Sequence, residues 1–188
     1  MDGMAKQKEA ADKAGAFDPT IFNISNATEL PAYMSAYSDS IMGGNSRINA
    51  QVEKDASGAN YIHISGKIVK KANLAFASMG ISLSKEQRAP ATDISDYSAI
   101  EFDARGNGEE YNLLYISDLV KDYNFHAAQF RPAKDWQTIR IPVSDIKQST
   151  KFGKQIPLDL KTIRVISFCA AGKDYPIDLD LKNIHLVK

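Results

Sequence analysis

The sequence predicts an all-β protein, an antiparallel β-sandwich of the jelly-roll type. Apolar and polar residues alternate with a period of two from residue 47 almost to the C-terminus, which is the pattern of half-buried strands. Turn residues separate roughly ten such runs, as in all-β sandwiches. No interior segment has a convincing helical period, so a βαβ fold, which needs crossover helices, does not fit.

One folded domain is predicted over residues 20–188, since domains usually span about 100 to 200 residues. Residues 1–19 are expected to be a flexible leader or linker. Within them, residues 4–16 are rich in Ala, Lys, Glu and Gln and could be helical, but their apolar positions are almost all Ala.

The charge balance argues against several classes of partner. Lys and Arg number 23, as do Asp and Glu, so the net charge is zero and gives no footprint for nucleic acid or an anionic membrane. No apolar run approaches the roughly 18 residues of a membrane span, so we expect a soluble chain without membrane insertion. No signal peptide is recognisable in the chain, but a removed one would leave no trace, so the compartment stays open.

The first strand is predicted at residues 20–24, and a short helical turn is predicted within residues 26–36. Alternation is clear at residues 61–65, where Ile62 and Ile64 share one face. The next strand has apolar residues on one face and Phe76 on the other. Those residues are Ala75, Ala77, Met79, Ile81 and Leu83.

Residues 106–108, Gly-Asn-Gly, predict a hairpin between strands at residues 98–105 and 111–117. Further strands are predicted at residues 123–130 and 137–143.

The nearly apolar run at residues 162–170 indicates a central strand. It contains Cys169, which has no partner for an internal disulfide and is expected to be buried. In the closing strand the apolar residues change parity, which predicts a β-bulge near Lys182 and Asn183. Ile177, Leu179 and Leu181 have one parity, and Ile184 and Leu186 have the other.

The most specific stretch is the motif loop, residues 39–46. Its adjacent glycines indicate a positive φ or a close approach of another chain. Ile41 and Met42 are expected to form a buried anchor beside a strand at residues 74–80. The oxygen-rich side chains suit a cation, a sugar hydroxyl or a self-bonded turn. The residues singled out are Asp39, Met42, Gly43, Gly44, Asn45 and Ser46.

No constellation of residues indicates an enzyme. The three histidines have neither metal-ligand spacing nor a neighbouring nucleophile motif. Asp178 and Asp180 lie on one strand face, but with Lys182 beside them they indicate a solvated or calcium-linked edge rather than a glycosidase pair. The glycines of residues 106–108 open no helix, so a dinucleotide site is not indicated.

Residues 39–46, 76–78 and 93–100 resemble, in order, motifs of the complex I intermediate-associated protein family. Two positions depart from the family pattern: Tyr37 stands where Trp is frequent, and Ala75 stands where Gly is frequent. The resemblance implies a galactose-binding-like jelly roll related to carbohydrate-binding modules, and a chaperone-like role in assembling respiratory complex I. It continues through residues 106–108, Tyr111, Phe130, Trp136, residues 141–142 and residues 177–184.

Two functions therefore stay open: an assembly or scaffold factor that binds a protein, and a module that recognises a glycan. Tyrosine suits both, because it combines a flat apolar face with a hydroxyl. The alternative for these aromatics is that half of them are core residues. Jelly rolls that resemble this one often hold a structural calcium, and Asp180 occupies the comparable place. The predicted ligand-binding residues are Tyr111, Tyr115, Tyr123, Phe125 and His126.

Overall fold

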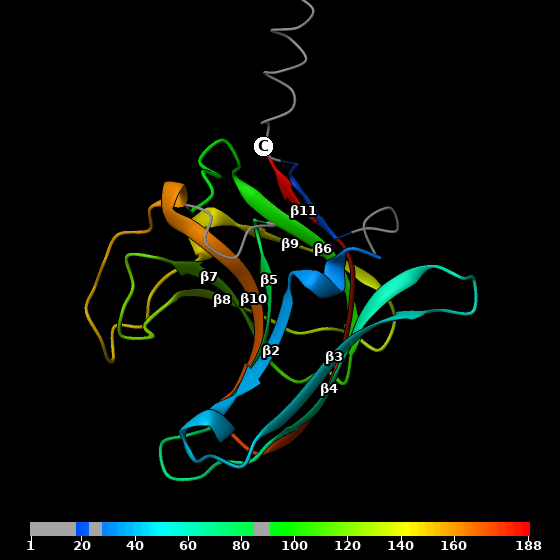
Figure 1. Cartoon of the computed structure of the whole chain (residues 1–188), viewed down its shortest axis with the longest axis horizontal. Helices are drawn as coiled ribbons and strands as arrows, with labels where there is room; N and C mark the ends of the chain where they lie inside the picture. Colours follow the sequence, from blue (N-terminus) through cyan, green and yellow to red (C-terminus); the bar gives the residue numbers. More distant parts are fainter. Residues whose placement is uncertain (1–17, 23–27, 85–90) are drawn as a thin grey trace, which may run out of the picture.

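The computed structural model describes residues 18–22, 28–84 and 91–188, and Figure 1 shows them as two layers of strands. This part of the chain contains eleven strands, and its only helical segments are short 3-10 turns. The strands are β1 Thr20–Phe22, β2 Met34–Ser38, β3 Arg47–Lys54, β4 Asn60–Ile68, β5 Phe76–Ser82, β6 Ala99–Gly106, β7 Tyr111–Ser117, β8 His126–Phe130, β9 Gln137–Pro142, β10 Ile163–Ala171 and β11 Tyr175–Val187. The 3-10 turns are η2 Leu30–Ala32, η3 Asp39–Met42, η4 Val143–Asp145 and η5 Leu160–Thr162.

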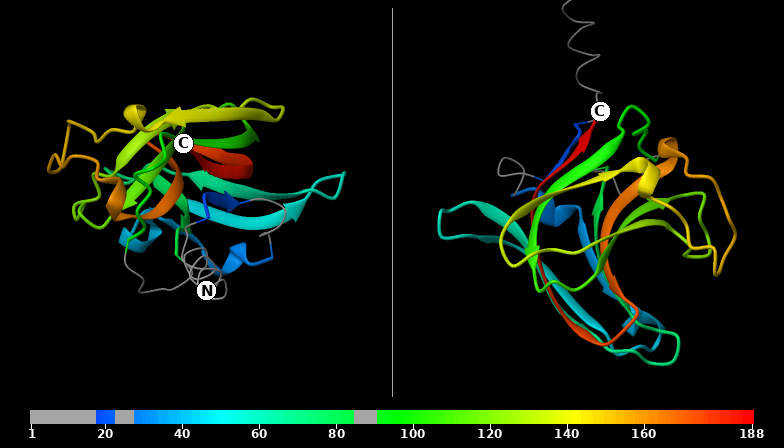
Figure 2. Two further views of the ribbon diagram at one scale, coloured as in Figure 1. Left: turned by 90° about the horizontal axis from the view of Figure 1, so that it is seen from above. Right: turned by 180° about the vertical axis from the view of Figure 1, so that it is seen from behind.

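The strands form two antiparallel sheets, as predicted. The six-stranded sheet has the order β3-β4-β11-β6-β9, with β1 also paired to β11. The five-stranded sheet has the order β2-β5-β10-β7-β8. Figure 2 shows the two sheets face to face, and the all-β sandwich expected from the alternating pattern is confirmed.

The core lies between the sheets because each strand points alternate side chains inward. Its centre is aromatic. Phe102 meets Phe130 and Phe168 edge to face, with ring centroids 5.1 and 5.2 Å apart. Tyr111 and Tyr115 of β7 belong to the same core, at 1% and 0% exposure.

Two predictions about the closing strands are confirmed. β10 is the middle strand of the five-stranded sheet. The pairing of β11 with β6 shifts register between Lys182 and His185, and Asn183 in this interval has a φ of 52°. This bulge lets apolar residues on both sides of it face the core.

Cys169 on β10 is buried, as expected. Burial raises the pKa of its thiol to about 11, so the thiolate is scarce at neutral pH.

The predicted Gly-Asn-Gly hairpin is wrong, because β6 and β7 belong to different sheets. The turn carries the chain across the sandwich instead. A Cβ on Gly106 would lie 2.4 Å from the carbonyl oxygen of Asp178, and the Asn107 amide donates to the Pro176 carbonyl at 2.7 Å. Glycine is needed at this crossing for close approach rather than for hairpin geometry.

One strand boundary also differs from prediction. Residues 123–125 precede β8 and are not part of it. The first strand is described over Thr20–Phe22, and the rest of the predicted strand, residues 23–24, lies outside the described residues, as do residues 25–27 and the leader up to residue 17.

Candidate functional site

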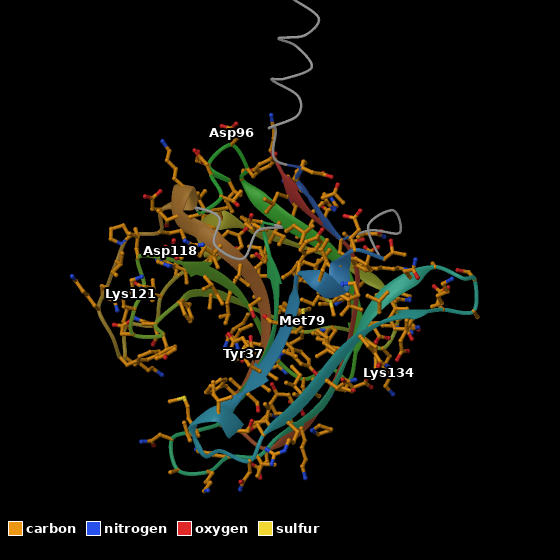
Figure 3. The ribbon with its side chains drawn as sticks, in the orientation of Figure 1. Tyr37, Met79, Asp96, Asp118, Lys121 and Lys134 are labelled. Atoms are coloured by element: carbon orange, nitrogen blue, oxygen red, sulfur yellow. The ribbon has the colours of Figure 1, made fainter. Side chains whose placement is uncertain are left out.

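The face of the five-stranded sheet that points away from the core is here called the outward face. On β5 the core residues Ala77, Met79 and Ile81 alternate with outward residues that start at Phe76. Figure 3 shows Tyr37 and Met79 on opposite sides of this sheet. The register extends the outward face across all five strands through Ser35, Tyr37, Phe76, Ser78, Gly80, Asn112, Leu114, Ala127, Gln129, Val165, Ser167 and Cys169.

Tyr37 and Phe76 are the aromatic residues of this face. Their rings meet edge to face with centroids 6.4 Å apart, and both side chains are partly exposed. Burial raises the pKa of the Tyr37 phenol, and hydrogen bonds with Ser78 and Ser167 offset part of that rise. The hydroxyls of Ser78 and Ser167 lie 2.6 Å apart and are fully buried. The phenol is therefore anchored at the middle of the face.

The motif loop follows β2 directly and is fixed by Asp39, which is 0% exposed. Its carboxylate accepts hydrogen bonds from the Ser46 N–H at 2.9 Å, the Ser46 hydroxyl at 2.7 Å and the Phe76 N–H at 3.1 Å. Burial alone would raise the pKa of Asp39, but these bonds and the nearby Arg47 together lower it. The buried carboxylate of Asp39 thus joins the two ends of the motif loop and ties the loop to β5.

The two glycines of the motif loop serve different purposes. Gly43 ends the 3-10 turn with a φ of 85°, so the prediction of positive φ is confirmed. A Cβ on Gly44 would lie 2.2 Å from Oδ1 of Asp39. Gly44 therefore leaves the space that the buried carboxylate occupies.

The prediction that Ile41 and Met42 form a buried anchor is wrong. Their exposed fractions are 74% and 57%. The anchor is polar instead, because Asp39 and Ser46 hold the loop and leave the two apolar side chains outside. Asn45 is also exposed.

A second exposed apolar group lies in two loops here called the lysine loops, residues 118–125 between β7 and β8 and residues 147–156 before β10. Asn124, at 1% exposure, joins them. Its amide donates to the carbonyls of Ser149 at 3.0 Å and Phe152 at 2.8 Å, and its oxygen accepts from the Ser149 N–H at 3.2 Å. Figure 1 and the right-hand view of Figure 2 show both loops side by side at the edge of the molecule.

The predicted ligand-binding residues divide between core and surface. Tyr111 and Tyr115 are buried in the core, which corrects their assignment to a ligand surface: parity along β7 points them inward. Tyr123 is 75% exposed, and its ring meets Phe125 edge to face at 6.3 Å. Binding by Tyr123 and Phe125 stays a prediction.

His126 is buried beneath the lysine loops. Its Nε2 lies 2.9 Å from the carbonyl oxygen of Ile156, which only accepts, so Nε2 holds the proton. Nδ1 is buried and has no partner among the described residues. Burial lowers the pKa of His126, and the bond to Ile156 offsets only part of that effect.

Asp180 lies on the other sheet, in a network of ion pairs. Its oxygens lie 2.7 Å from Arg105 Nε and 2.7 Å from His63 Nδ1. The Arg105 guanidinium also lies over the Trp136 ring, 4.7 Å from its centroid. His63, Asp178 and Asp180 could together offer three ligand atoms to a metal.

This donor set does not fit calcium well. Calcium prefers six to eight oxygen ligands, whereas Asp180 faces a guanidinium and an imidazole nitrogen. A calcium ion would have to displace Arg105 from the carboxylate. The calcium expectation stays a prediction, and the geometry favours ion pairing.

The sequence did not identify the aromatic pair of the outward face as a candidate site. Tyr37 was noted as a departure from a family pattern and not as a site residue. The signal that could have found it is parity: Tyr37 and Phe76 both fall outside the apolar parity of their strands.

Solved structures with a similar fold include several carbohydrate-binding modules. The family 11 module of the cellulosomal cellulase Lic26A-Cel5E of Clostridium thermocellum superposes with a TM-score of 0.62 at 21% identity, covering 82% of this chain and 87% of that one. The same module in complex with a β-1,3-1,4-mixed-linked tetrasaccharide gives 0.61, and the Clostridium thermocellum family 30 module of Cel9D-Cel44B gives 0.58 at 14% identity, covering 83% and 91% of the two chains. At these identities the likeness shows the fold, which is a jelly roll as predicted.

A curated relative is Endoglucanase 3 of Fibrobacter succinogenes, 31% identical over 103 residues. The match covers 53% of this chain but only 15% of that protein's length. The model of the Complex I intermediate-associated protein 30 family, in contrast, matches residues 22–181. The chain therefore belongs to the Complex I intermediate-associated protein 30 (CIA30) family.

Proposed function

We propose that this protein is a non-enzymatic assembly or scaffold factor that docks a client protein on the outward face of the five-stranded sheet. The observation that supports this most is the exposed pair Ile41 and Met42, held beside Phe76 by the buried Asp39. Large apolar side chains at such exposure mark interaction sites when they adjoin further apolar surface. Tyr37 and Phe76 provide that surface.

Exposed apolar side chains gather at two ends of the five-stranded sheet in the described residues, and the pair in the motif loop adjoins Tyr37 and Phe76. All large hydrophobic residues that are exposed in the described part of the chain belong to loops next to strands of the five-stranded sheet. None lies on the outside of the six-stranded sheet. Those residues are Ile41, Met42, Leu119, Tyr123 and Phe152. Family membership supports a client related to respiratory complex I.

The test is capture of complex I subunits by the tagged full-length chain in its native cells. The wild type is expected to co-migrate with an assembly intermediate on native gels, and the double variant Ile41→Ser with Met42→Ser is expected to lose it. Leu119→Ser is the matched control, because it removes an exposed apolar residue at the lysine loops. Equal loss in the control, or no capture by the wild type, would contradict the proposal.

A glycan ligand is the second candidate, and it is favoured by Tyr37 and Phe76 together with the carbohydrate-binding modules of similar fold. Aromatic faces stack on sugars. A glycan array with Tyr37→Ala and Phe76→Ala separates the two functions. Glycan binding that these variants abolish, but that the Ile41→Ser and Met42→Ser variant keeps, would favour the glycan role over the protein client.

A further inference from the structure

The lysine loops combine exposed apolar side chains with unpaired positive charge. Tyr123 is 75% exposed, Phe152 is 55% exposed and Leu119 is 45% exposed. From these loops we propose that this end of the molecule binds the surface of an anionic membrane. The proposal is independent of the client site on the outward face.

The lysine loops contain four lysines and two aspartates, although the whole chain is neutral. Lys121, Lys147 and Lys151 have no acidic partner within the described residues. Asp118 is paired with Arg164. Asp122 accepts the backbone N–H of Lys154 at 2.6 Å and interacts with the Lys154 charge. The neutral total therefore conceals a local basic patch that complements anionic lipid headgroups.

Lys121 lies at the outer edge of the molecule (Figure 3). Figure 3 shows Lys121 and Asp118 at one edge of the molecule, and Lys134 at the opposite side. Lysines near an anionic membrane each increase binding by about fivefold, and the effect declines within a Debye length. A loop tip that projects from the sandwich brings its lysines within that distance.

The loops are built to hold their apolar residues outside. Tyr123 has a φ of 64°, which is strained for a bulky residue. A Cβ on Gly153 would lie 2.6 Å from the Asn124 Cβ, so this glycine lets one loop pass close to the other. Lys147 exchanges two backbone hydrogen bonds with Ala127 of β8, each 2.9 Å. Holding Tyr123 in this position strains its backbone. A binding interaction at the tip of the loops would explain why the strained, exposed position is kept.

The apolar component favours a membrane over an acidic protein or nucleic acid. Tyr and Phe with flanking Lys are the residues that settle at a membrane interface, where rings enter the headgroup region and ammonium groups remain outside. Purely electrostatic partners would not need Tyr123 and Phe152 exposed. No helix in the described residues is long and apolar enough to span a membrane, so the contact proposed is peripheral.

Co-sedimentation with vesicles tests the proposal. The full-length chain is expected to sediment with vesicles of phosphatidylcholine mixed with phosphatidylserine, to remain in solution with phosphatidylcholine alone, and to be released by high salt. Lys121→Gln with Lys151→Gln is expected to weaken binding by about twentyfold or more. Tyr123→Asn with Phe152→Ser is expected to abolish detectable binding, and Asn tolerates the positive φ of residue 123.

Two control variants test whether any loss of binding is specific to the lysine loops. Ile41→Ser with Met42→Ser removes equally exposed apolar residues at the motif loop, and Lys54→Gln with Lys134→Gln removes exposed charge elsewhere; both are expected to bind as the wild type does. No binding of the wild type to phosphatidylserine vesicles would overturn the proposal. So would equal loss in the controls, or binding that the lysine variant loses and the aromatic variant keeps, because the partner would then be recognised by charge alone.

Discussion

The motif loop and the lysine loops both expose apolar side chains, but different chemical groups hold the two regions in place. Each holds apolar side chains in water by means of one buried polar residue. In the motif loop this residue is Asp39, an anion that only accepts hydrogen bonds. In the lysine loops it is Asn124, a neutral amide that both donates and accepts. A charged centre binds its donors more strongly, and it is more costly to remove.

The largest expected effect is therefore at Asp39. Asp39→Ala leaves the Ser46 and Phe76 N–H groups without their acceptor in a buried site, and we expect a loss of about 3 kcal/mol in the free energy of unfolding. Urea denaturation measures it. Asp93→Ala is the control, because Asp93 also accepts two hydrogen bonds from a serine two residues later but is exposed. Similar losses in both variants would show that burial of Asp39 is unimportant.

The two glycines of the motif loop provide a sharper test. Gly44→Ala forces a Cβ against the Asp39 carboxylate, and we expect a loss of about 2 to 3 kcal/mol. Gly43→Ala meets no atom within 4 Å, so only the positive φ is unfavourable, at about 1 kcal/mol. Thermal melts in parallel measure the difference. A larger loss at Gly43 would mean that backbone strain outweighs the clash.

Asn124→Ala is expected to cost about 2 kcal/mol, less than Asp39→Ala, because its lost partners are neutral. The variant should also increase hydrogen exchange in residues 147–156 while leaving the motif loop protected. Asn49→Ala, on the exposed face of β3, is the matched control and should change stability by less than about 0.5 kcal/mol. Uniform loss of protection in both loops would show that the two ends are coupled.

Mild acid is expected to loosen the lysine loops before the motif loop. Burial lowers the pKa of His126 below its ordinary value of 6.5, so its contribution to stability is complete above about pH 6.5 and is lost as the pH falls toward the folded pKa. The hydrogen bonds to Asp39 lower its pKa from the ordinary value of 3.8. Its contribution to stability therefore persists until the pH falls below 3.8. Protection factors of the Ile156 and Ser46 amides between pH 7 and pH 4 measure the order. A His126→Gln variant that keeps the same pH dependence would contradict it.

The smallest expected effect concerns calcium. Asp180 already faces Arg105 and His63, so a chelator should leave the melting temperature unchanged. A chelator-induced decrease that Asp180→Ala abolishes would instead establish the calcium site, since a ligand bound only by the native state stabilises it.

Much of the fold could be predicted because it depends on parity. Period-two alternation identified most strands, the run ending near Cys169 indicated the central strand, and the change of parity located the bulge at Asn183. The Gly-Asn-Gly turn failed because local turn chemistry does not say whether the next strand joins the same sheet. That outcome depends on the packing of Gly106 against β11, which is a long-range contact.

The site was harder to predict for the same reason. Parity could have separated the core residue Tyr111 from the outward residue Tyr37, but it does not show which outward residues form a binding surface. Ile41 and Met42 are apolar, and hydrophobicity favours burial. Their exposure depends on Asp39, whose donors Ser46 and Phe76 are 7 and 37 residues away. Such buried polar centres are set by tertiary structure.

The burial of Cys169 also makes the protein a convenient background for spectroscopy. Cys169 is the single cysteine of the chain, and the residue is 7% exposed. Burial raises the pKa of its thiol to about 11, which keeps the thiol unreactive toward alkylating probes at neutral pH. A cysteine introduced at Met42 or Lys121 would therefore take up a spin label or fluorophore selectively. Reporters at the two ends of the molecule could then follow client docking and vesicle contact in separate channels, with the native thiol left in place.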